Sequence, residues 1–373
     1  SGNEAAAVLN GLYAALPVAN GVKEVATADE LTDALADSSI SIITLKDDVE
    51  ISSTLTVNRT VTLDLNGNVL KMTGSDSVIK VEADGDLTIQ DRNTTTQHTF
   101  NPHCKYQFWY IDMWELDKDG SEIVSGGVIT GGGGDQNNGG GVLVAGGTLT
   151  MAGGSIVGCS ARSRGGGVYL GKDSDTGKSG TFIMTSGSII GCAAQLGGGV
   201  YVTSGCTFVM ATSSNIHNCI ANNDGGGVIN HGTFQMRGGT ISTCTTVAFG
   251  GGGVCNNGTF IMSDGMIKGC TSPDGQYASG GGVRNSNQFT MTGGMIGDPD
   301  NENDASHVYN TSSQETTLTI SGNAKIYTDI TNVGILNADG GEIAGTMTND
   351  TNRYGTGSEG AAGSTEFHGK VTN

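Results

Sequence analysis

The chain has 373 residues, of which 63 are glycine, only 4 are proline and 15% are charged. Its formal net charge is −19, which opposes binding to nucleic acid or to an anionic membrane surface, because Lys and Arg hold both. No apolar run reaches the roughly 20 residues of a membrane span, and the ordered recurrence of the apolar residues, 36% of the chain, excludes a disordered protein. We therefore expect one elongated folded domain.

Two helical segments are predicted near the start of the chain. Residues 4–16 have apolar side chains at helical spacing and are followed by Pro17. Thr27-Ala28-Asp29-Glu30 has the form of a capping box, with Thr27 at the N-cap and Glu30 three positions later. We assign residues 1–39 to an N-terminal helical segment and cap that covers one end of the domain.

Short strands are predicted from residue 40 onward. Segments such as 55–57, 61–65 and 87–89 place apolar side chains at every second position, so one face of each strand is buried. The strands are too short and too far apart for hairpins, and no helical period lies between them. Parallel coiling of the chain is the remaining solution.

Residues 94–122 interrupt the strand pattern and contain both tryptophans. One interpretation is a satellite core that seals the flank of the coils. The other is a binding platform whose aromatic faces stack on sugars or anchor a protein partner. The candidate ligand-binding residues are Tyr106, Trp109, Tyr110 and Trp114.

The same segment contains carboxylates and metal-binding residue types. If the chain is an enzyme, Asp112, Glu115 and Asp117 are the catalytic candidates, since glycoside hydrolysis uses two carboxyl groups about 5 to 9 Å apart. His98 and His103 lie nearby, but their spacing matches no zinc motif.

An internal repeat determines the predicted fold. The string GGGV begins at six positions, in steps of 26, 32, 28, 26 and 29 residues: Gly139, Gly165, Gly197, Gly225, Gly251 and Gly280. Aligned on it, the repeats give inward ladders of Phe or Leu, of Met and of Ile, and no repeat can bury its apolar face alone. We predict an all-β protein: a single right-handed parallel β-helix over residues 40–345, with about eleven coils of about 4.8 Å each.

Five cysteines, each three residues after the ladder Ile, form a further ladder: Cys159, Cys192, Cys219, Cys244 and Cys270. Parallel side chains keep neighbouring Cβ atoms farther apart than a disulfide prefers. We expect buried free thiols rather than disulfides or metal ligands.

Acidic residues alternate after the last regular repeat, at Asp298, Asp300, Glu302 and Asp304. Calcium loops have this alternation, but the Gly at the sixth position and the Glu at the twelfth are absent. A solvated acidic turn is the alternative, and calcium is the only cofactor that the sequence leaves open. Residues 346–373, rich in Gly, Ser and Thr, are predicted to be a flexible tail.

Three segments carry a family resemblance: TVTLDLNGNVL at 60–70, GGGVYL at 165–170 and GTFIM at 180–184. They resemble the right-handed β-helix regions of large surface proteins from Gram-positive gut bacteria, over about residues 25–343, and are similar in style to autotransporter passenger adhesins. The resemblance implies an extracellular, surface-displayed adhesin. It supplies no functional residue, because the shared motifs are architectural.

Three functions fit these features. The first is a surface adhesin that binds a glycan or a host surface protein through the aromatic loop. The second is a carbohydrate-active enzyme, a glycoside hydrolase or polysaccharide lyase, on the same fold. The third is a structural subunit that associates end to end, because the ends of a β-helix are latent sheet edges.

Overall fold

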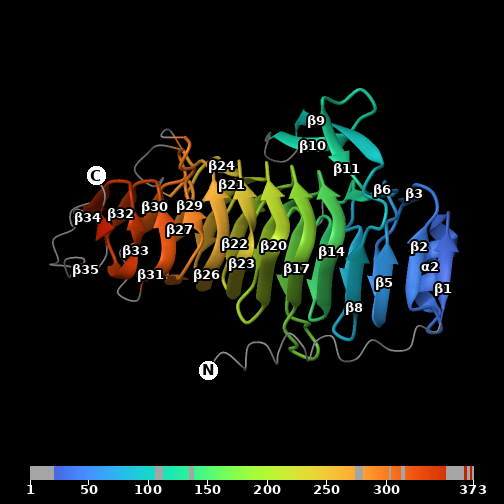
Figure 1. Ribbon diagram of the computed structural model, residues 1–373. Coiled ribbons are helices and arrows are strands. Elements are labelled where there is room, and N and C mark those ends of the chain that lie inside the picture. Colours follow the sequence, from blue (N-terminus) through green and yellow to red (C-terminus); the bar gives the residue numbers. More distant parts are fainter. Residues whose placement is uncertain are drawn as a thin grey trace.

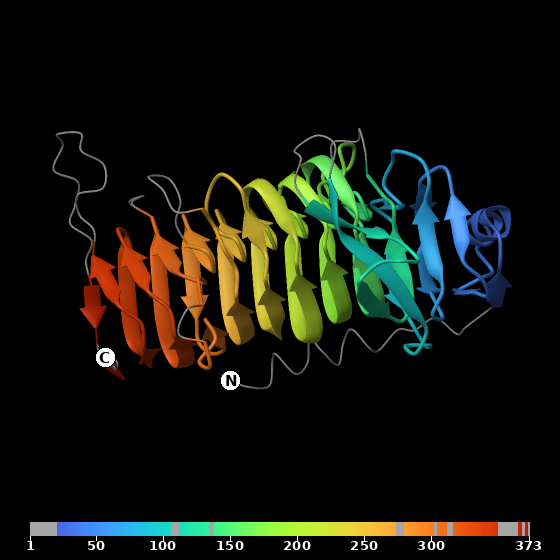
Figure 2. The same ribbon diagram turned by 90° about the horizontal axis from the view of Figure 1, so that it is seen from above.

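The computed structural model describes residues 21–105, 112–133, 138–273, 280–301, 304–311, 316–349, 365–367 and 370–371. These residues form an elongated stack of parallel coils with a small antiparallel sheet on one flank (Figures 1 and 2). The prediction of an all-β parallel β-helix is confirmed. Within the described part of the chain, no helix is long and apolar enough to span a membrane.

The N-terminal cap is α2 (Ala28–Ala36), as the capping box predicts. Thr27 Oγ1 accepts a hydrogen bond from the Glu30 N–H, and Glu30 Oε2 accepts one from the Ala26 N–H at 2.8 Å. Leu31 and Ala34 are buried against the first coil. The predicted segment 4–16 lies outside the described residues.

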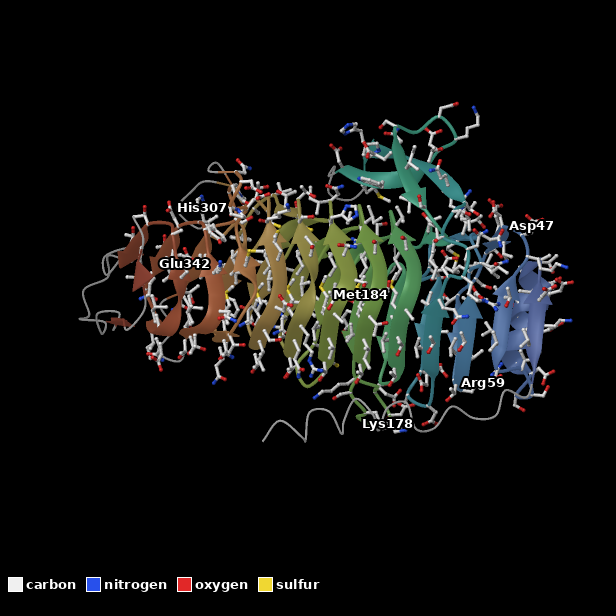
Figure 3. The ribbon with its side chains drawn as sticks, in the orientation of Figure 1. Asp47, Arg59, Lys178, Met184, His307 and Glu342 are labelled. Atoms are coloured by element: carbon white, nitrogen blue, oxygen red, sulfur yellow. The ribbon has the colours of Figure 1, made fainter. Side chains whose placement is uncertain are left out.

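Arg59 fastens this cap to the coils. Its guanidinium donates to the carbonyls of Ala34, Leu35 and Ile40 at 2.6 to 2.9 Å, and so satisfies acceptors at the C-terminal end of α2. Figure 3 shows Arg59 beside the first coils. Desolvation by these contacts lowers the pKa of Arg59 from its usual value.

The largest sheet, which we call the bent sheet, contains the long strands, each with two arms joined by a bend. Each strand pairs in parallel with the corresponding strand of the neighbouring coil. They are β1 (Val22–Val25), β2 (Ile42–Leu45), β3 (Val49–Ile51), β5 (Thr60–Asp64), β6 (Val69–Met72), β8 (Asp86–Gln90), β12 (Val128–Thr130), β14 (Thr148–Val157), β17 (Thr181–Ile190), β20 (Thr207–His217), β23 (Thr233–Ser242), β26 (Thr259–Lys268), β28 (Gln288–Met291), β29 (Met295–Ile296), β31 (Thr317–Ile326), β33 (Ile335–Ile343), β35 (Thr365–Phe367) and β36 (Lys370–Val371).

The predicted ladders lie inside the bent sheet in register. Phe182, Phe208, Phe234, Phe260 and Phe289 stack with ring centroids 4.5 to 4.8 Å apart and are at most 1% exposed. The Met and Ile ladders are buried beside them, and Figure 3 shows Met184 in the middle of the bent sheet. Each ring packs on the rings above and below it, which makes neighbouring coils depend on one another.

The second sheet, which we call the short-strand sheet, has 11 strands in the described part of the chain, in agreement with about eleven predicted coils. They are β4 (Leu55–Val57), β7 (Ile79–Val81), β13 (Val142–Ala145), β16 (Val168–Gly171), β19 (Val200–Val202), β22 (Val228–Asn230), β25 (Val254–Asn256), β27 (Val283–Asn285), β30 (Val308–Asn310), β32 (Ile330–Asn332) and β34 (Met347–Asn349).

An asparagine ladder ends the strands of the later coils. Each Nδ2 donates to the Oδ1 of the next asparagine at 2.8 Å, along Asn230, Asn256, Asn285, Asn310 and Asn332. The five side chains are at most 1% exposed. Sequence reasoning missed this ladder, although its signal, an Asn two residues after the Val or Ile that begins the strand, recurs in each of these coils.

Between the two large sheets lies a corner sheet of four strands: β15 (Ser160–Arg164), β18 (Ala193–Leu196), β21 (Ile220–Asp224) and β24 (Thr245–Thr246). Cys159, Cys192, Cys219 and Cys244 each directly precede one of these strands, and all five ladder cysteines are free and buried, as expected. Cys192 Sγ lies 3.8 Å from the carbonyl oxygen of Ile156 in the preceding coil. Burial raises the pKa of the thiols of Cys159, Cys192, Cys219 and Cys244 well above the usual value.

Two predicted boundaries differ from the structure. β1 precedes α2 and pairs with β2, so the first strand of the fold lies inside the segment assigned to the cap. In the predicted tail 346–373, β34 continues the short-strand sheet, and β35 and β36 pair with β33. Backbone pairing with the preceding coil places these segments in the fold, whereas Gly, Ser and Thr content alone suggested a linker.

Candidate functional site

The insertion predicted at 94–122 forms a three-stranded antiparallel sheet: β9 (Gln97–Lys105), β10 (Asp112–Leu116) and β11 (Glu122–Ser125). Figure 1 shows it standing on the flank of the stack. Phe100, Trp114 and Val124 pack on side chains of the bent sheet, including Val157 and Ile190. The insertion therefore has its own apolar contact with the coils.

Trp114 belongs to this contact rather than to a binding surface. Its side chain is buried, with 7% exposure, and its backbone N–H donates to the Gly191 carbonyl at 3.0 Å. A Cβ at Gly158 or Gly191 would overlap with Trp114, and both glycines have positive φ. The structure thus places Trp114 as the satellite-core interpretation expects; Tyr106, Trp109 and Tyr110 lie outside the described residues.

The three acidic candidates of the insertion lie on β10 and directly after it. Asp112 lies 3.7 Å from His103 Nδ1, and Glu115 is exposed next to the buried Trp114. Asp117 Oδ1 accepts a hydrogen bond from the Asp119 N–H at 3.0 Å in the following turn. Along the strand direction Asp112 stands about 16 Å from Asp117, whereas Glu115 and Asp117, two residues apart, stand about 7 Å apart, a separation that glycosidase carboxyl groups can have.

The acidic turn predicted as a calcium site is tied to the fold. Asp298 forms an ion pair with Lys268 at 3.0 Å and accepts a hydrogen bond from the Asp300 N–H, and both contacts lower the pKa of Asp298. Asp304 is buried and accepts from the Gly269 N–H. Glu302 lies outside the described residues, among which no three His, Cys, Asp or Glu side chains form a metal-binding group.

A row of outward side chains runs along the short-strand sheet, one from the middle of each strand. We call it the outer row. From β4 to β32 it contains Thr56, Lys80, Leu143, Tyr169, Tyr201, Ile229, Cys255, Arg284, Tyr309 and Thr331. Sequence reasoning used only the inward positions of these strands and therefore did not identify it.

The middle of the outer row is aromatic. The rings of Tyr169 and Tyr201 stack at 5.6 Å, His231 lies 5.4 Å from Tyr201, and the Arg164 guanidinium lies 5.5 Å above the Tyr201 ring. Burial raises the pKa of both tyrosine hydroxyls and, together with Arg164, lowers the pKa of His231. The two tyrosine rings stack on each other from neighbouring strands, so this cluster packs one coil against the next.

A partly buried charge pair follows the aromatic cluster. Arg284 Nη1 lies 3.6 Å from Asp224 Oδ1 and 3.8 Å from Cys255 Sγ. Burial raises the pKa of Asp224 and raises the pKa of the Cys255 thiol to about 12, so this thiol stays protonated at neutral pH.

At the N-terminal end of the outer row lies a cavity of about 260 Å³. It is lined by Thr54, Thr56, Asp76, Ser77, Lys80, Asn138 and Leu143. Three paired strands, β4, β7 and β13, contribute its outer-row residues and make it rigid.

One lining residue contains a buried polar side-chain atom without a hydrogen-bond partner among the described residues. Asn138 Oδ1 is buried and has no hydrogen-bond partner within the described part of the chain. The backbone around it is held, because Ser77 Oγ donates to the Asn138 carbonyl at 3.4 Å and Thr54 Oγ1 donates to the Ser77 carbonyl at 2.8 Å. The cavity thus combines fixed polar groups with the apolar side chain of Leu143, as ligand sites do.

Comparison with known proteins adds one finding. Residues 22–132 match a family model described as "putative pectate lyase-like adhesive domain". These coils are similar to an adhesive β-helix domain. The match includes β4 and β7 of the cavity, whereas Asn138 and Leu143 follow it. No curated protein and no solved structure matches the chain.

Proposed function

We propose that this chain is a non-catalytic adhesin module of a bacterial cell surface, which binds a glycan on the outer face of its β-helix. The cavity beside Tyr169 carries the proposal, because its polar groups converge on a space next to an apolar wall. The similarity of residues 22–132 to an adhesive domain supports it. The net charge of −19 favours neutral glycans and proteins over polyanions as partners.

The aromatic loop of the insertion supplies a second proposed contact. Tyr106, Trp109 and Tyr110 belong to the segment between β9 and β10, and the sheet of these strands is held on the coils by Trp114. A loop on such a base suits contact with a longer glycan or with a host surface protein. Trp109→Ala is expected to weaken retention of a large ligand and to leave folding intact.

The observed geometry favours adhesion over the two alternatives. None of the acidic candidates of the insertion lines the cavity. For end-to-end association, the first coil is covered by α2, and the edge strand β1 carries the exposed charges Lys23 and Glu24, which oppose pairing with another chain.

The test is retention of intact sugars. The purified chain is incubated with mucin and plant glycan panels, and bound and released sugars are analysed by mass spectrometry. We expect retained glycans of unchanged length. Shortened products that disappear with Asp112→Asn would make the chain an enzyme, and retention of no glycan at all would refute the proposal.

A further inference from the structure

We propose that the chain associates side by side with a second copy through the outward face of the first arms of the bent sheet. The contact is made by seven neighbouring strands, β14, β17, β20, β23, β26, β28 and β31. These strands belong to a different sheet from the outer row, so the association is independent of the proposed glycan binding.

The first and third residues of each of these strands point outward, and we call this set the threonine face. In β17 they are Thr181 and Ile183, which alternate with the buried Phe182 and Met184. At both positions the residues of neighbouring strands are paired without a register shift. All of these side chains are half-buried or exposed, and Figure 1 shows the strands side by side with the insertion sheet near their C-terminal ends.

The threonine face carries no charge, although the chain has a net charge of −19. Nine of its residues are Thr, three are Ile or Val and two are Gln. A place in this sheet does not by itself exclude charge, because the second arms carry Lys268 on β26 and Lys325 on β31. Outward acidic residues appear only in the flanking strands, at Asp86 on β8 and Asp339 on β33. Depletion of charged residues is typical of the centre of a protein interface.

The spacing of the threonine face selects a second copy as the partner. Its rows repeat every 4.8 Å or so along the stack, and another copy offers rows of the same spacing. The side chains of one copy can therefore lie between the rows of the other along the whole contact, as they do between paired stacked sheets. Facing Thr hydroxyls can donate to and accept from each other, while Ile183, Val209 and Ile261 are removed from water.

The threonine face is also large enough for a specific contact. Seven coils of about 4.8 Å and an arm of about five residues give about 550 Å² in each copy and about 1,100 Å² together, which exceeds the roughly 1,000 Å² that such an interface needs. Arg237, at the bend of β23, lies at the border and donates to Gln235 Oε1 at 2.6 Å. Because both copies use the same surface, the association closes at two copies.

The test is the mass of the chain in solution at increasing concentration, measured by analytical ultracentrifugation. We expect an equilibrium between one and two copies, without larger species. Added sodium chloride should lower the dissociation constant, because it screens the repulsion between two chains of net charge −19 and finds no ion pair to weaken in the threonine face. A dissociation constant that rises with salt would instead indicate contact through ion pairs and would overturn the proposal.

Charged variants test the threonine face itself. Val209→Lys, in the third strand of the seven, should raise the dissociation constant at least about tenfold, because each copy would bury an unpaired cation. The added lysine makes the net charge less negative, so stronger overall repulsion cannot explain the loss. Ile261→Lys, at a side chain that is 37% exposed, should act in the same way and guards against misfolding of one variant. Thr331→Lys adds the same charge to the short-strand sheet and should leave the dissociation constant unchanged.

Three other results would overturn the proposal. The first is the mass of one chain at every concentration and salt. The second is growth beyond two copies, which would assign the association to the ends of the stack. The third is a Val209→Lys variant that has the circular dichroism of the unaltered chain and associates equally well. If the chain stays monomeric and Val209→Lys loses retained glycan, the threonine face binds a glycan in place of a second copy.

Discussion

Replacing one asparagine of the buried ladder should destabilise the protein by an amount that depends on its position in the ladder. Asn256, in the interior, donates to Asn285 Oδ1 at 2.8 Å and to two backbone carbonyls, and its Oδ1 accepts from Asn230 and from Gly258. Asn256→Val removes five hydrogen bonds and takes one partner each from its ladder neighbours Asn230 and Asn285. With about 1 kcal/mol for each net hydrogen bond, partly offset by the buried apolar side chain, we expect a loss of about 3 to 4 kcal/mol.

Asn230 is the matched comparison at the end of the ladder. It makes three side-chain hydrogen bonds, only one of them to another ladder asparagine, and the preceding coil has Val202 at the same position. Asn230→Val places a second valine next to Val202 at the same position of the next coil. We expect the free energy of unfolding to fall by about 1 to 2 kcal/mol.

Urea unfolding followed by circular dichroism measures the free energies of unfolding of both variants. The two values can be compared if the slope of the free energy against urea concentration is unchanged. The exposed Asn215→Ala serves as a control and should stay within about 0.5 kcal/mol of the unaltered chain. If the interior and end variants lose equal stability, the ladder does not act as a connected network, and the reasoning fails.

Four other predictions follow from buried or paired groups. Phe234→Ala should cost about 3 to 5 kcal/mol in urea unfolding, since it opens a gap between two stacked rings; a loss below about 1 kcal/mol would contradict the packing. Burial lowers the pKa of His217 and His231 from 6.5, so the unfolded chain binds more protons than the folded one below pH 7; stability should fall from about pH 7 to pH 5, and His217→Gln with His231→Gln should flatten this slope. All 8 cysteines should titrate as thiols in the denatured chain without reductant, because the seven whose side chains the structure describes are free; fewer would reveal a disulfide. Calcium should leave the melting temperature unchanged, because Asp298 and Asp304 already have internal partners. A calcium-dependent rise in melting temperature that is lost in Asp300→Ala would instead support a calcium site in this turn.

Sequence alone predicted the inward side of the fold because that side repeats. The Phe, Met and Ile ladders share one spacing in each repeat, and a two-residue period assigns them to the buried face. The capping box predicted the start of α2 through a local contact between Thr27 and Glu30. These features depend on neighbours a few residues away or on a regular repeat, and both can be recognised without coordinates.

The candidate site depended on contacts that the repeat does not encode. Thr54 and Ser77 meet Asn138 only because β7 pairs with β13 across the insertion, with Ile79 opposite Val142. The distance in sequence between these coils differs from the regular step, so the alignment of the repeats could not place them together. Sequence thus determined the stack and its core through periodicity, whereas tertiary structure decided which outward side chains share a cavity and that Trp114 faces the coils.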